Sequence, residues 1–289
     1  MSPAKKGAKT STPKKAASLK GKKVPSNEFQ FYEMPKYYDM ALERDTCPEI
    51  EFYKRMFDEF SDVKPVKRVL EPACGTGLFL EWLPKFDFYA AGYDLAEPMV
   101  KFAKERLDKL GYTGKKADAY VGDMRTIRFE KKFDAAINLV NSIGYLTKDE
   151  DIINHFKVTA DSLNDGCIYS IEVGLKCDDF KNEYMPDETW HVNKDGIEVT
   201  CTWQPHDYDE PNKIRHIAFH MKVNDHGKII EVNETHSLRL WTHEDLVDLA
   251  GKGGFKLMGV YLQDFSRIPD SQRIVGDPGG LYYILKKKA

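Results

Sequence analysis

The stretch that decides the fold is Val69-Leu70-Glu71-Pro72-Ala73-Cys74-Gly75-Thr76-Gly77. Its apolar first half predicts a short buried strand, and a helical pattern starts at Leu78. The small residues between them let a ligand approach the backbone closely, and the following helix presents free N–H groups. In doubly wound α/β folds, such a loop after the first strand binds a nucleotide.

The glycine spacing indicates which nucleotide this loop binds. A dinucleotide fingerprint, G-x-G-x-x-G, needs a third glycine at a fixed position. That position is Leu80 when the pattern starts at Gly75, and Leu78 when it starts at Ala73. Neither register fits, so the loop does not predict a nicotinamide dehydrogenase.

Strands and helices alternate on both sides of this motif. The expected strands are 68–71, 88–93, 119–121, 133–139 and 167–173, and the expected helices are 48–60, 78–83, 97–110 and 148–164. The last of these helices is expected to end near Asp165-Gly166. This alternation predicts a parallel sheet with helices on both faces, the doubly wound α/β class.

After the fifth strand the pattern changes. Three β-runs follow at 197–203, 214–223 and 229–240, and Asp225-His226-Gly227 is a hairpin signal between the last two. We expect an antiparallel insertion at about 176–240 that covers one end of the sheet. A helix at 242–250, capped by Thr242 with Asp245 three residues on, then precedes two final strands at 255–262 and 281–286. The expectation is therefore a seven-stranded mixed sheet.

Composition restricts the class of protein. Of the 289 residues, 42% are hydrophobic and 31% are charged, which is typical of a globular chain. The net charge is −3, but eight lysines and no acid lie in the first 23 residues, which leaves −11 on the rest. An acidic body does not suit a nucleic acid. We expect a disordered tail at 1–26, a single domain at 27–289 and a cytoplasmic protein without a membrane span.

Acidic residues also end later strands. Asp94 follows the second strand, 17 residues after Gly77. A carboxylate at that place can accept hydrogen bonds from both ribose hydroxyls of a nucleotide. Asp123-Met124 follows the third strand, and the segment at 133–138 forms the fourth.

Together these segments resemble the cofactor motifs of class I methyltransferases, which have a Rossmann-like fold. Ala73 stands where that family has the first glycine of its motif I. The resemblance implies S-adenosylmethionine as cofactor and S-adenosylhomocysteine as product, with Asp123 near the adenine amino group and the Leu139 carbonyl near the amino group of the cofactor. The candidate cofactor-binding residues are Glu71, Ala73, Gly75, Gly77, Asp94, Leu95, Met99, Asp123, Met124 and Leu139.

A closer resemblance is to small-molecule N-methyltransferases, the glycine/sarcosine and nucleotide-sugar N,N-dimethyltransferases. It rests on the segments 122–125, 133–135, 142–146 and 236–242. It implies that Tyr38, from a Tyr38-Asp39 pair, together with Asn141 and Tyr145, surrounds the acceptor. Because the ordinary pKa of tyrosine is about 10, we expect these tyrosines to orient the acceptor by hydrogen bonds. The segment 171–180 lacks the arginine with which the glycine enzymes hold a carboxylate.

The expected reaction is methyl transfer to a small-molecule acceptor, an amine in the first instance. The alternatives are O-methylation, methylation of a protein or nucleic acid anchored by the lysine-rich tail, and a non-enzymatic cofactor-binding scaffold. Seven of the eight histidines lie between 191 and 243, so one of them is a candidate base, but none can be singled out. No cysteine or glutamate near these histidines completes a metal-ligand pattern. A homodimer through the insertion is a further expectation.

Overall fold

The computed structural model describes residues 30–176, 187–275 and 279–289, so the predicted tail at 1–26 lies outside the described residues. The main sheet has eight strands in the order β11-β10-β12-β5-β4-β1-β2-β3. Its strands are β1 (Arg68–Pro72), β2 (Tyr89–Asp94), β3 (Ala117–Val121), β4 (Phe133–Asn138), β5 (Leu163–Gly174), β10 (Phe255–Tyr261), β11 (Arg267–Ile268) and β12 (Gly280–Lys287). The prediction of a mixed α/β sheet is confirmed.

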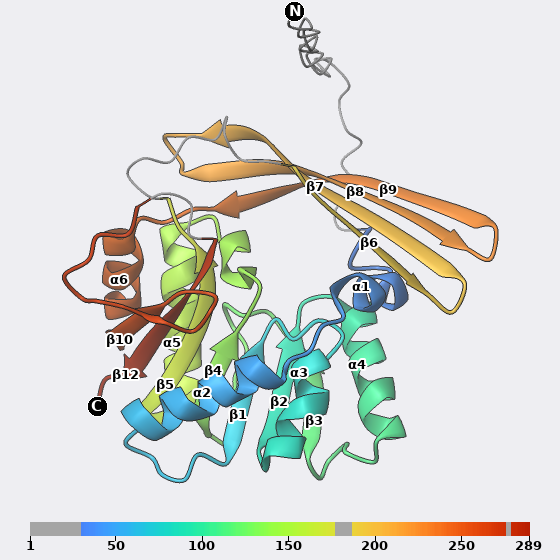
Figure 1. Ribbon diagram of the computed structural model, residues 1–289. Helices are drawn as coiled ribbons and strands as arrows, with labels where there is room; N and C mark the ends of the chain where they lie inside the picture. The colour runs from blue at the N-terminus through green and yellow to red at the C-terminus, as the bar shows by residue number, and fades with distance from the viewer. Residues whose placement is uncertain (1–29, 177–186, 276–278) are drawn as a thin grey trace, which may run out of the picture.

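Helices cover both faces of this sheet (Figure 1). They are α2 (Cys47–Phe60), α3 (Leu78–Trp82) with the 3₁₀ helix η1 (Leu83–Phe86), α4 (Glu97–Lys109), α5 (Asp149–Ser162) and α6 (His243–Lys252). The apolar sides of α2, α3 and α4 pack in one core cluster, and those of α5 and α6 pack in the other. The fold is therefore doubly wound, because each face of the sheet has its own buried core.

β1 is the strand that positions the site. It lies between β4 and β2, parallel to both, so that Leu70 pairs with Ala136 on one side and Ala91 on the other. A central parallel strand is buried on both faces, which explains why every residue of β1 from Val69 to Pro72 is buried. The carboxyl ends of β1, β2 and β4 consequently meet at one edge of the sheet, where ligands bind in such folds.

In the main sheet and its helices, β11, the end of α5 and the start of β5 differ from the sequence prediction. The eighth strand, β11, is added because the chain turns back through Phe265, whose φ is +65°, to pair Ile268 with Val260. Helix α5 ends at Ser162, and β5 already starts at Leu163, where it pairs with Phe133. The predicted stop at Asp165-Gly166 was therefore wrong, because tertiary pairing of the strand takes precedence over the local turn signal.

The second sheet is antiparallel and lies across one end of the main sheet (Figure 1). It contains β6 (Glu188–Lys194), β7 (Ile197–Asp209), β8 (Ile214–Asp225) and β9 (Lys228–Arg239), in that order. The predicted hairpin is confirmed: His226 and Gly227 form its two-residue turn, and both have positive φ, as the favoured hairpin turn requires. The strand β6 was not predicted.

A short helix, α1 (Pro35–Leu42), lies under the second sheet. Its Ala41 and the preceding Phe31 are buried against apolar residues of β7 and β8, among them Phe219 and Val199. The aromatic rings of Phe31 and Phe219 have centroids 4.5 Å apart. This segment therefore joins the second sheet to the motif at the end of β1.

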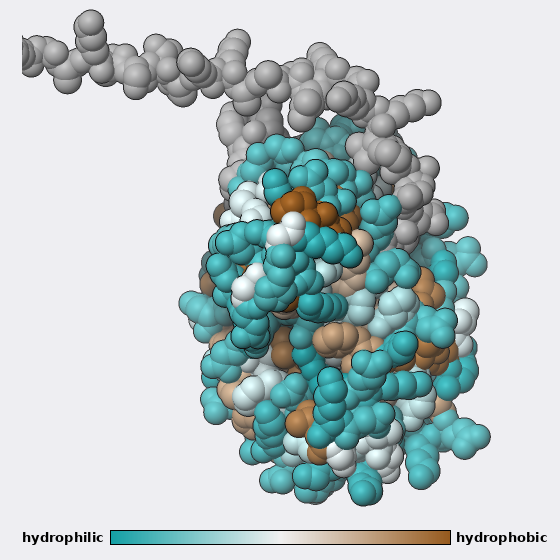
Figure 2. Space-filling view, turned by 90° about the vertical axis from the view of Figure 1, so that its right-hand side faces the viewer, coloured by the Kyte–Doolittle hydropathy of each residue, from teal (hydrophilic) through white to brown (hydrophobic). Residues whose placement is uncertain are grey.

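The surface shown in Figure 2 is mainly hydrophilic, and its apolar groups gather in small patches. Within the described ranges, no helix combines the length and the apolar character that a membrane crossing needs.

Candidate active site

The loop after β1 is strongly curled. Ala73, Gly75 and Gly77 all have positive φ, at +56°, +51° and +76°. The Cys74 N–H donates to the Tyr93 carbonyl at 3.0 Å, which holds the loop against β2. A Cβ on Gly77 would lie 2.9 Å from the Cβ of Ala103, so α4 packs closely only against a glycine there. An alanine at positive φ is strained, and such strain persists mainly at functional sites.

Asp94 ties the loop to the end of β2. Its carboxylate accepts from the Gly75 N–H and from the Ala96 N–H, both at 2.9 Å. Burial raises the pKa of Asp94 from its ordinary value, although the backbone hydrogen bonds act in the opposite direction. Each oxygen of the Asp94 carboxylate can accept one more hydrogen bond, and the two hydroxyls of a ribose could donate them. Leu95 beside it is 69% exposed, so an apolar side chain faces outward at this edge.

Glu71 is a buried carboxyl with an unused oxygen. It is 4% exposed, and its Oε2 has no hydrogen-bond partner among the described residues. Burial raises the pKa of Glu71 well above its ordinary value, Asp94 and Glu49 raise it further, and Arg44 acts against this. Buried polar atoms are normally paired, so this oxygen is ready to accept from a cationic ligand.

The other predicted cofactor residues are engaged differently. The Asp123 carboxylate pairs with Arg125 at 2.6 Å, and this guanidinium lowers the pKa of Asp123. The Met124 carbonyl lies 3.1 Å from Nδ1 of His155. Met99 is fully buried on α4. The structure thus brings Glu71, Ala73, Gly75, Gly77 and Asp94 together at the ends of β1 and β2.

The loop after β4 is the second strained segment. Val140 and Asn141 both have a φ of +52°. Hydrogen bonds to β5 hold them: the Val140 N–H donates to Glu172 Oε2 at 2.8 Å, and the Gly174 N–H donates to Asn141 Oδ1 at 3.2 Å. The Leu139 carbonyl accepts from the backbone N–H and the hydroxyl of Ser142. It therefore already has two donors where the resemblance implied a contact to the cofactor.

A cavity of about 690 Å³ lies between this loop, α1 and the second sheet. Many of its walls are aromatic, contributed by Phe31, Tyr32, Tyr38, Tyr145, Trp190, Trp203 and Phe219. It shares lining residues with a smaller cavity over Glu71 and Ala73, among them Tyr38 and Val140. A cavity of this size, with aromatic walls and several polar and charged groups, lies in the size range of small-ligand sites.

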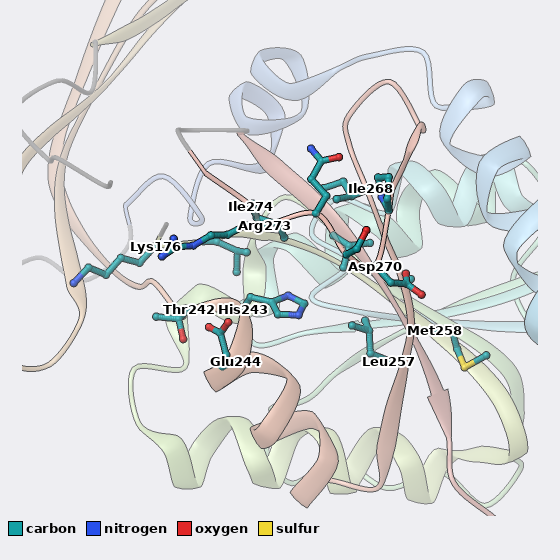
Figure 3. A pocket seen from close by; sticks show the side chains of 16 residues that line it. Lys176, Thr242, His243, Glu244, Leu257, Met258, Ile268, Asp270, Arg273 and Ile274 are labelled. Atoms are coloured by element: carbon teal, nitrogen blue, oxygen red, sulfur yellow. The ribbon is translucent and has the colours of Figure 1, made fainter. Parts of the chain in front are cut away.

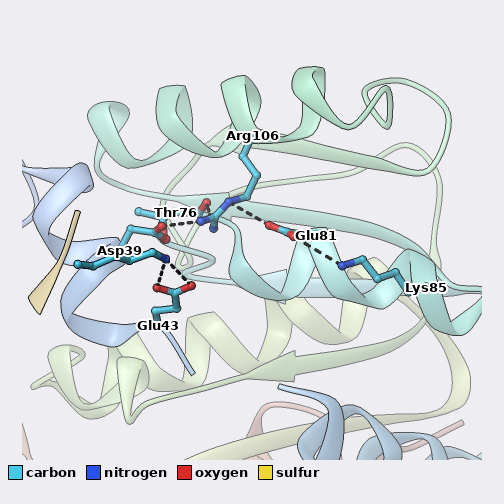
Figure 4. Close-up of polar contacts among 7 residues, drawn as sticks. Asp39, Glu43, Thr76, Glu81, Lys85 and Arg106 are labelled. Atoms are coloured by element: carbon cyan, nitrogen blue, oxygen red, sulfur yellow. Dashed lines mark hydrogen bonds and ion pairs between the residues drawn. The ribbon is translucent and has the colours of Figure 1, made fainter. Parts of the chain in front are cut away.

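The two residues of the predicted Tyr38-Asp39 pair make different contacts. Tyr38 lies over the motif loop, since a Cβ on Gly75 would be 3.3 Å from its hydroxyl. Asp39 turns away and accepts from the Thr76 hydroxyl at 2.8 Å and from Arg106 at 2.6 Å. In Figure 4, Arg106 lies between Asp39 and Glu81. Asp39 therefore fastens α1 to the motif loop and to α4.

Sequence reasoning missed Tyr32 and Glu234, and it did not single out His236. The Tyr145 hydroxyl lies 2.6 Å from the Tyr32 hydroxyl and 2.6 Å from Nδ1 of His236. Nε2 of His236 lies 2.9 Å from Glu234 Oε1. The one signal in the sequence is that Glu234 and His236 stand two apart on a strand and so share a face.

A third cavity, of about 470 Å³, lies beside α6 and β10 (Figure 3). Lys176, His243 and Arg273 are among its lining residues. None of the predicted site residues lines it, and among the described residues it shares only Leu175 with the cavity of about 690 Å³. In the described part of the chain, no group of three potential metal ligands occurs.

The fold and the site define an α/β enzyme that holds a nucleoside ligand at the ends of β1 and β2. Residues 69–166 match the methyltransferase domain family. This match and the relatives described next support a class I methyltransferase that uses S-adenosylmethionine.

Three known proteins illustrate the relationship. An N,N-dimethyltransferase of dTDP-3-amino-3,4,6-trideoxy-alpha-D-glucopyranose from Streptomyces venezuelae is 29% identical over 174 residues, which are 60% of this chain and 68% of the relative. A structure of a methyltransferase from Clostridium acetobutylicum has a TM-score of 0.69 at 18% identity, covering 90% of this chain and 99% of that one. A sugar N-methyltransferase from Streptoalloteichus has a TM-score of 0.68 at 20% identity, covering 97% and 100%.

The residues present fit this cofactor. The unpaired oxygen of Glu71 suits its ammonium group, and the remaining lone pairs of Asp94 suit its ribose hydroxyls. The glycine at 75 leaves free the space that a Cβ would take beside Tyr38.

Proposed function

We propose that the protein methylates the nitrogen of a small-molecule amine, and that an amino sugar is the acceptor class to test first. The observation that carries this proposal is the cavity of about 690 Å³ beneath the second sheet, which shares Tyr38 and Val140 with the smaller cavity over the motif loop. A cavity of this size accommodates a sugar or another small molecule. The amino-sugar specificity of the Streptomyces relative supports the choice of class.

The charge of the cavity also favours an amine. Glu172 lines it and is largely buried, and its Oε2 accepts from the Val140 N–H. Burial raises the pKa of Glu172 from its ordinary value. Pairing with a cationic or hydrogen-bonding amine would offset this desolvation. Among the described lining residues, three carboxyl groups (Glu43, Glu172 and Glu188) stand against two guanidinium groups (Arg44 and Arg215).

S-adenosylmethionine, when bound, supplies a sulfonium methyl group whose bond to sulfur breaks as a neutral amine attacks, the electron pair staying on sulfur. The protein's task is to align the amine and exclude water. We assign the orienting hydrogen bonds to Tyr38 and Tyr145. Burial raises the pKa of both tyrosines, so both hydroxyls keep their protons at neutral pH. Asn141, bonded to Gly174, holds the loop after β4 in place.

The test is a methyl-transfer assay with the full chain, radiolabelled S-adenosylmethionine and a panel of amino sugars, simple amines and their hydroxyl analogues. We expect the amines to gain label at nitrogen and the hydroxyl analogues to gain none. Label on the hydroxyl analogues alone would establish O-methylation instead. Label that appears only on added protein or nucleic acid, and disappears when residues 1–26 are removed, would establish a macromolecular substrate.

Two further properties belong to this proposal. A cytoplasmic location fits the reduced state of the described cysteines, Cys47, Cys74, Cys167 and Cys201. A homodimer through the second sheet is supported by its two edge strands, β6 and β9, which can pair with another strand. Light scattering of the purified protein tests the dimer, and a monomeric mass across the micromolar range would contradict it.

A further inference from the structure

His155 is a buried histidine that the proposed reaction does not use. It lies on α5, outside the range 191–243 that holds the other seven histidines. Its Nδ1 is 3.1 Å from the Met124 carbonyl oxygen, and its Nε2 is 2.7 Å from the Tyr169 hydroxyl. Both His155 and Tyr169 are 0% exposed. Two buried side chains, from α5 and β5, therefore hold the backbone of the segment after β3.

The hydrogen-bond partners of His155 determine which of its nitrogens carries the proton. A backbone carbonyl only accepts hydrogen bonds, so the contact with Met124 requires a proton on Nδ1. Burial lowers the pKa of His155 to about 4, so near pH 7 the ring is neutral and Nε2 carries no proton. Burial also raises the pKa of Tyr169 well above its ordinary value, so its hydroxyl keeps the proton that it donates to Nε2. The ring is thus a neutral donor held in one tautomer.

The segment that His155 holds is a closed turn at 122–127. The N–H groups of Thr126 and Ile127 both donate to the Asp123 carbonyl at 3.0 Å. A Cβ on Gly122 would lie 2.4 Å from Cδ1 of Ile127, so the turn closes only with a glycine at that position. The Gly122 N–H donates to the Asp94 carbonyl at 2.9 Å, which places the start of the turn beside the carboxylate assigned to the ribose.

The order of the strands indicates which end of the nucleoside lies at this turn. Glu71 at the end of β1 suits the ammonium group, and Asp94 at the end of β2 suits the ribose. The next strand in the sheet is β3, so a base attached to that ribose extends toward the turn, away from Glu71. Leu95 and Val121, at the ends of β2 and β3, are 69% and 53% exposed. A purine ring there would cover apolar surface that is otherwise in contact with water.

Helix α5 also contacts the turn at a second point. The Asp151 carboxylate lies 3.6 Å from Nη1 of Arg125. The Arg125 side chain is 42% exposed, and ion pairs at such exposed sites stabilise little. The hydrogen bond from His155 is shielded from water, and its loss would remove the donor from the Met124 carbonyl. His155 is therefore the stronger of the two connections between α5 and the turn.

We propose that His155 and Tyr169 are positioning residues that fix the turn 122–127 against the adenine ring of the cofactor and so set the selectivity for that base. This inference rests on S-adenosylmethionine as the cofactor and not on the class of acceptor. Neither side chain lines the cavity over the motif loop or the cavity beneath the second sheet. They act through the Met124 backbone, which keeps the Asp123 carboxylate where an adenine amino group can donate to it.

The test compares the binding of S-adenosylhomocysteine and S-inosylhomocysteine to the full chain by calorimetric titration. The inosine base has an oxygen in place of the amino group, so it cannot donate to a carboxylate, and the unmodified chain should prefer the adenine compound. His155→Leu, which removes the donor to Met124, should weaken S-adenosylhomocysteine about tenfold and lower the ratio of the two affinities by a similar factor. His155→Asn, whose amide nitrogen can take the place of Nδ1, should keep most of that ratio.

Ser162→Ala is the matched control. Ser162 is 2% exposed on the same helix, and its hydroxyl donates to the Val158 carbonyl at 2.8 Å, away from the turn. This variant should lower Tm and leave the ratio of the two affinities unchanged. A merely structural role for His155 would weaken both compounds by the same factor. That result, or an unchanged affinity of His155→Leu for S-adenosylhomocysteine, would overturn the inference.

A measurement without any ligand separates this inference from the choice of cofactor. If the unmodified chain binds neither compound, the assignment of the cofactor has failed, and the hydrogen bonds of His155 can still be tested. Long-range nitrogen NMR of histidine-labelled protein, assigned with His155→Leu, should show the proton of His155 on Nδ1. Tyr169→Phe should shift the Nε2 resonance of the same ring. A proton on Nε2, or an Nε2 resonance that Tyr169→Phe leaves in place, would overturn the inference.

Discussion

Glu71→Gln should stabilise the protein without cofactor and weaken cofactor binding. Glu71 is buried with one unpaired oxygen, and burial raises its pKa well above the ordinary value. Between the unfolded and folded pKa values the folded chain therefore holds a proton that the unfolded chain has lost. The free energy of unfolding then falls as pH rises, by about 1.4 kcal/mol per pH unit. A glutamine at position 71 does not ionise, so it adds no such pH dependence to the free energy of unfolding.

The expected magnitude follows from this slope. The unfolded pKa is about 4.3, so the advantage of Glu71→Gln should be small near pH 4 and grow by about 1.4 kcal/mol with each pH unit above it, up to the raised pKa of the folded chain. In a chain of this size, each such unit corresponds to roughly 2 to 3 °C in Tm. Cofactor affinity should move in the opposite direction, by roughly 10- to 100-fold, because a hydrogen bond from a cation to this carboxylate is lost.

The assay is differential scanning calorimetry of both proteins from about pH 4 to pH 8, with and without saturating S-adenosylhomocysteine. Glu49→Gln is the matched control, because Glu49 is also buried but accepts two hydrogen bonds from Arg44 at 3.1 and 3.2 Å. It should destabilise the protein instead. Parallel Tm curves for Glu71→Gln and the unmodified chain at every pH would refute the reasoning, because Glu71 would then ionise as it does in the unfolded chain.

Two further substitutions test how the motif loop is held. Gly75→Ala should lower cofactor affinity at least tenfold by calorimetric titration, because its Cβ would be 3.3 Å from the Tyr38 hydroxyl at a φ of +51°; an unchanged affinity would show that α1 moves freely. Asp39→Asn should cost about 2 kcal/mol in urea unfolding, because it weakens charge-assisted hydrogen bonds from Arg106 and Thr76. It should also speed amide exchange in α1, and exchange as slow as in the unmodified chain would contradict that role.

Most of the main sheet could be predicted from the sequence, because its strands carry their own signal. The apolar run before Glu71 forms a buried parallel strand, and the Thr242–Asp245 capping box starts α6 as expected. The elements that were missed depend on partners elsewhere. β6 has mostly exposed side chains and exists because it pairs with β7. β11 has two residues, too few for any pattern.

The site residues also fall into two groups, those with a local sequence signal and those brought together only by the tertiary fold. Asp94 was found because a strand end followed by an acid is a local pattern, and its bond to the Gly75 N–H spans only 19 residues. The contact between Tyr145 and His236 spans 91 residues, and the one between Phe31 and Glu234 spans 203. No local rule places such residues together, because the second sheet must first fold over the end of the main sheet. The pairing of Asp39 with Tyr38 as residues near the acceptor also rested on sequence neighbours alone. In the structure the Asp39 side chain accepts from Arg106, which is 67 residues away in the sequence.

The most direct measurement is calorimetric titration of the full chain with S-adenosylmethionine, S-adenosylhomocysteine and NAD, repeated with Asp94→Ala. Asp94 is the residue to change because it links the motif loop to β2 and offers lone pairs to a ribose. The account predicts micromolar binding of the two sulfur nucleosides, no binding of NAD, and loss of binding in the variant. Binding of NAD alone, or nucleoside binding that the variant leaves unchanged, would contradict it.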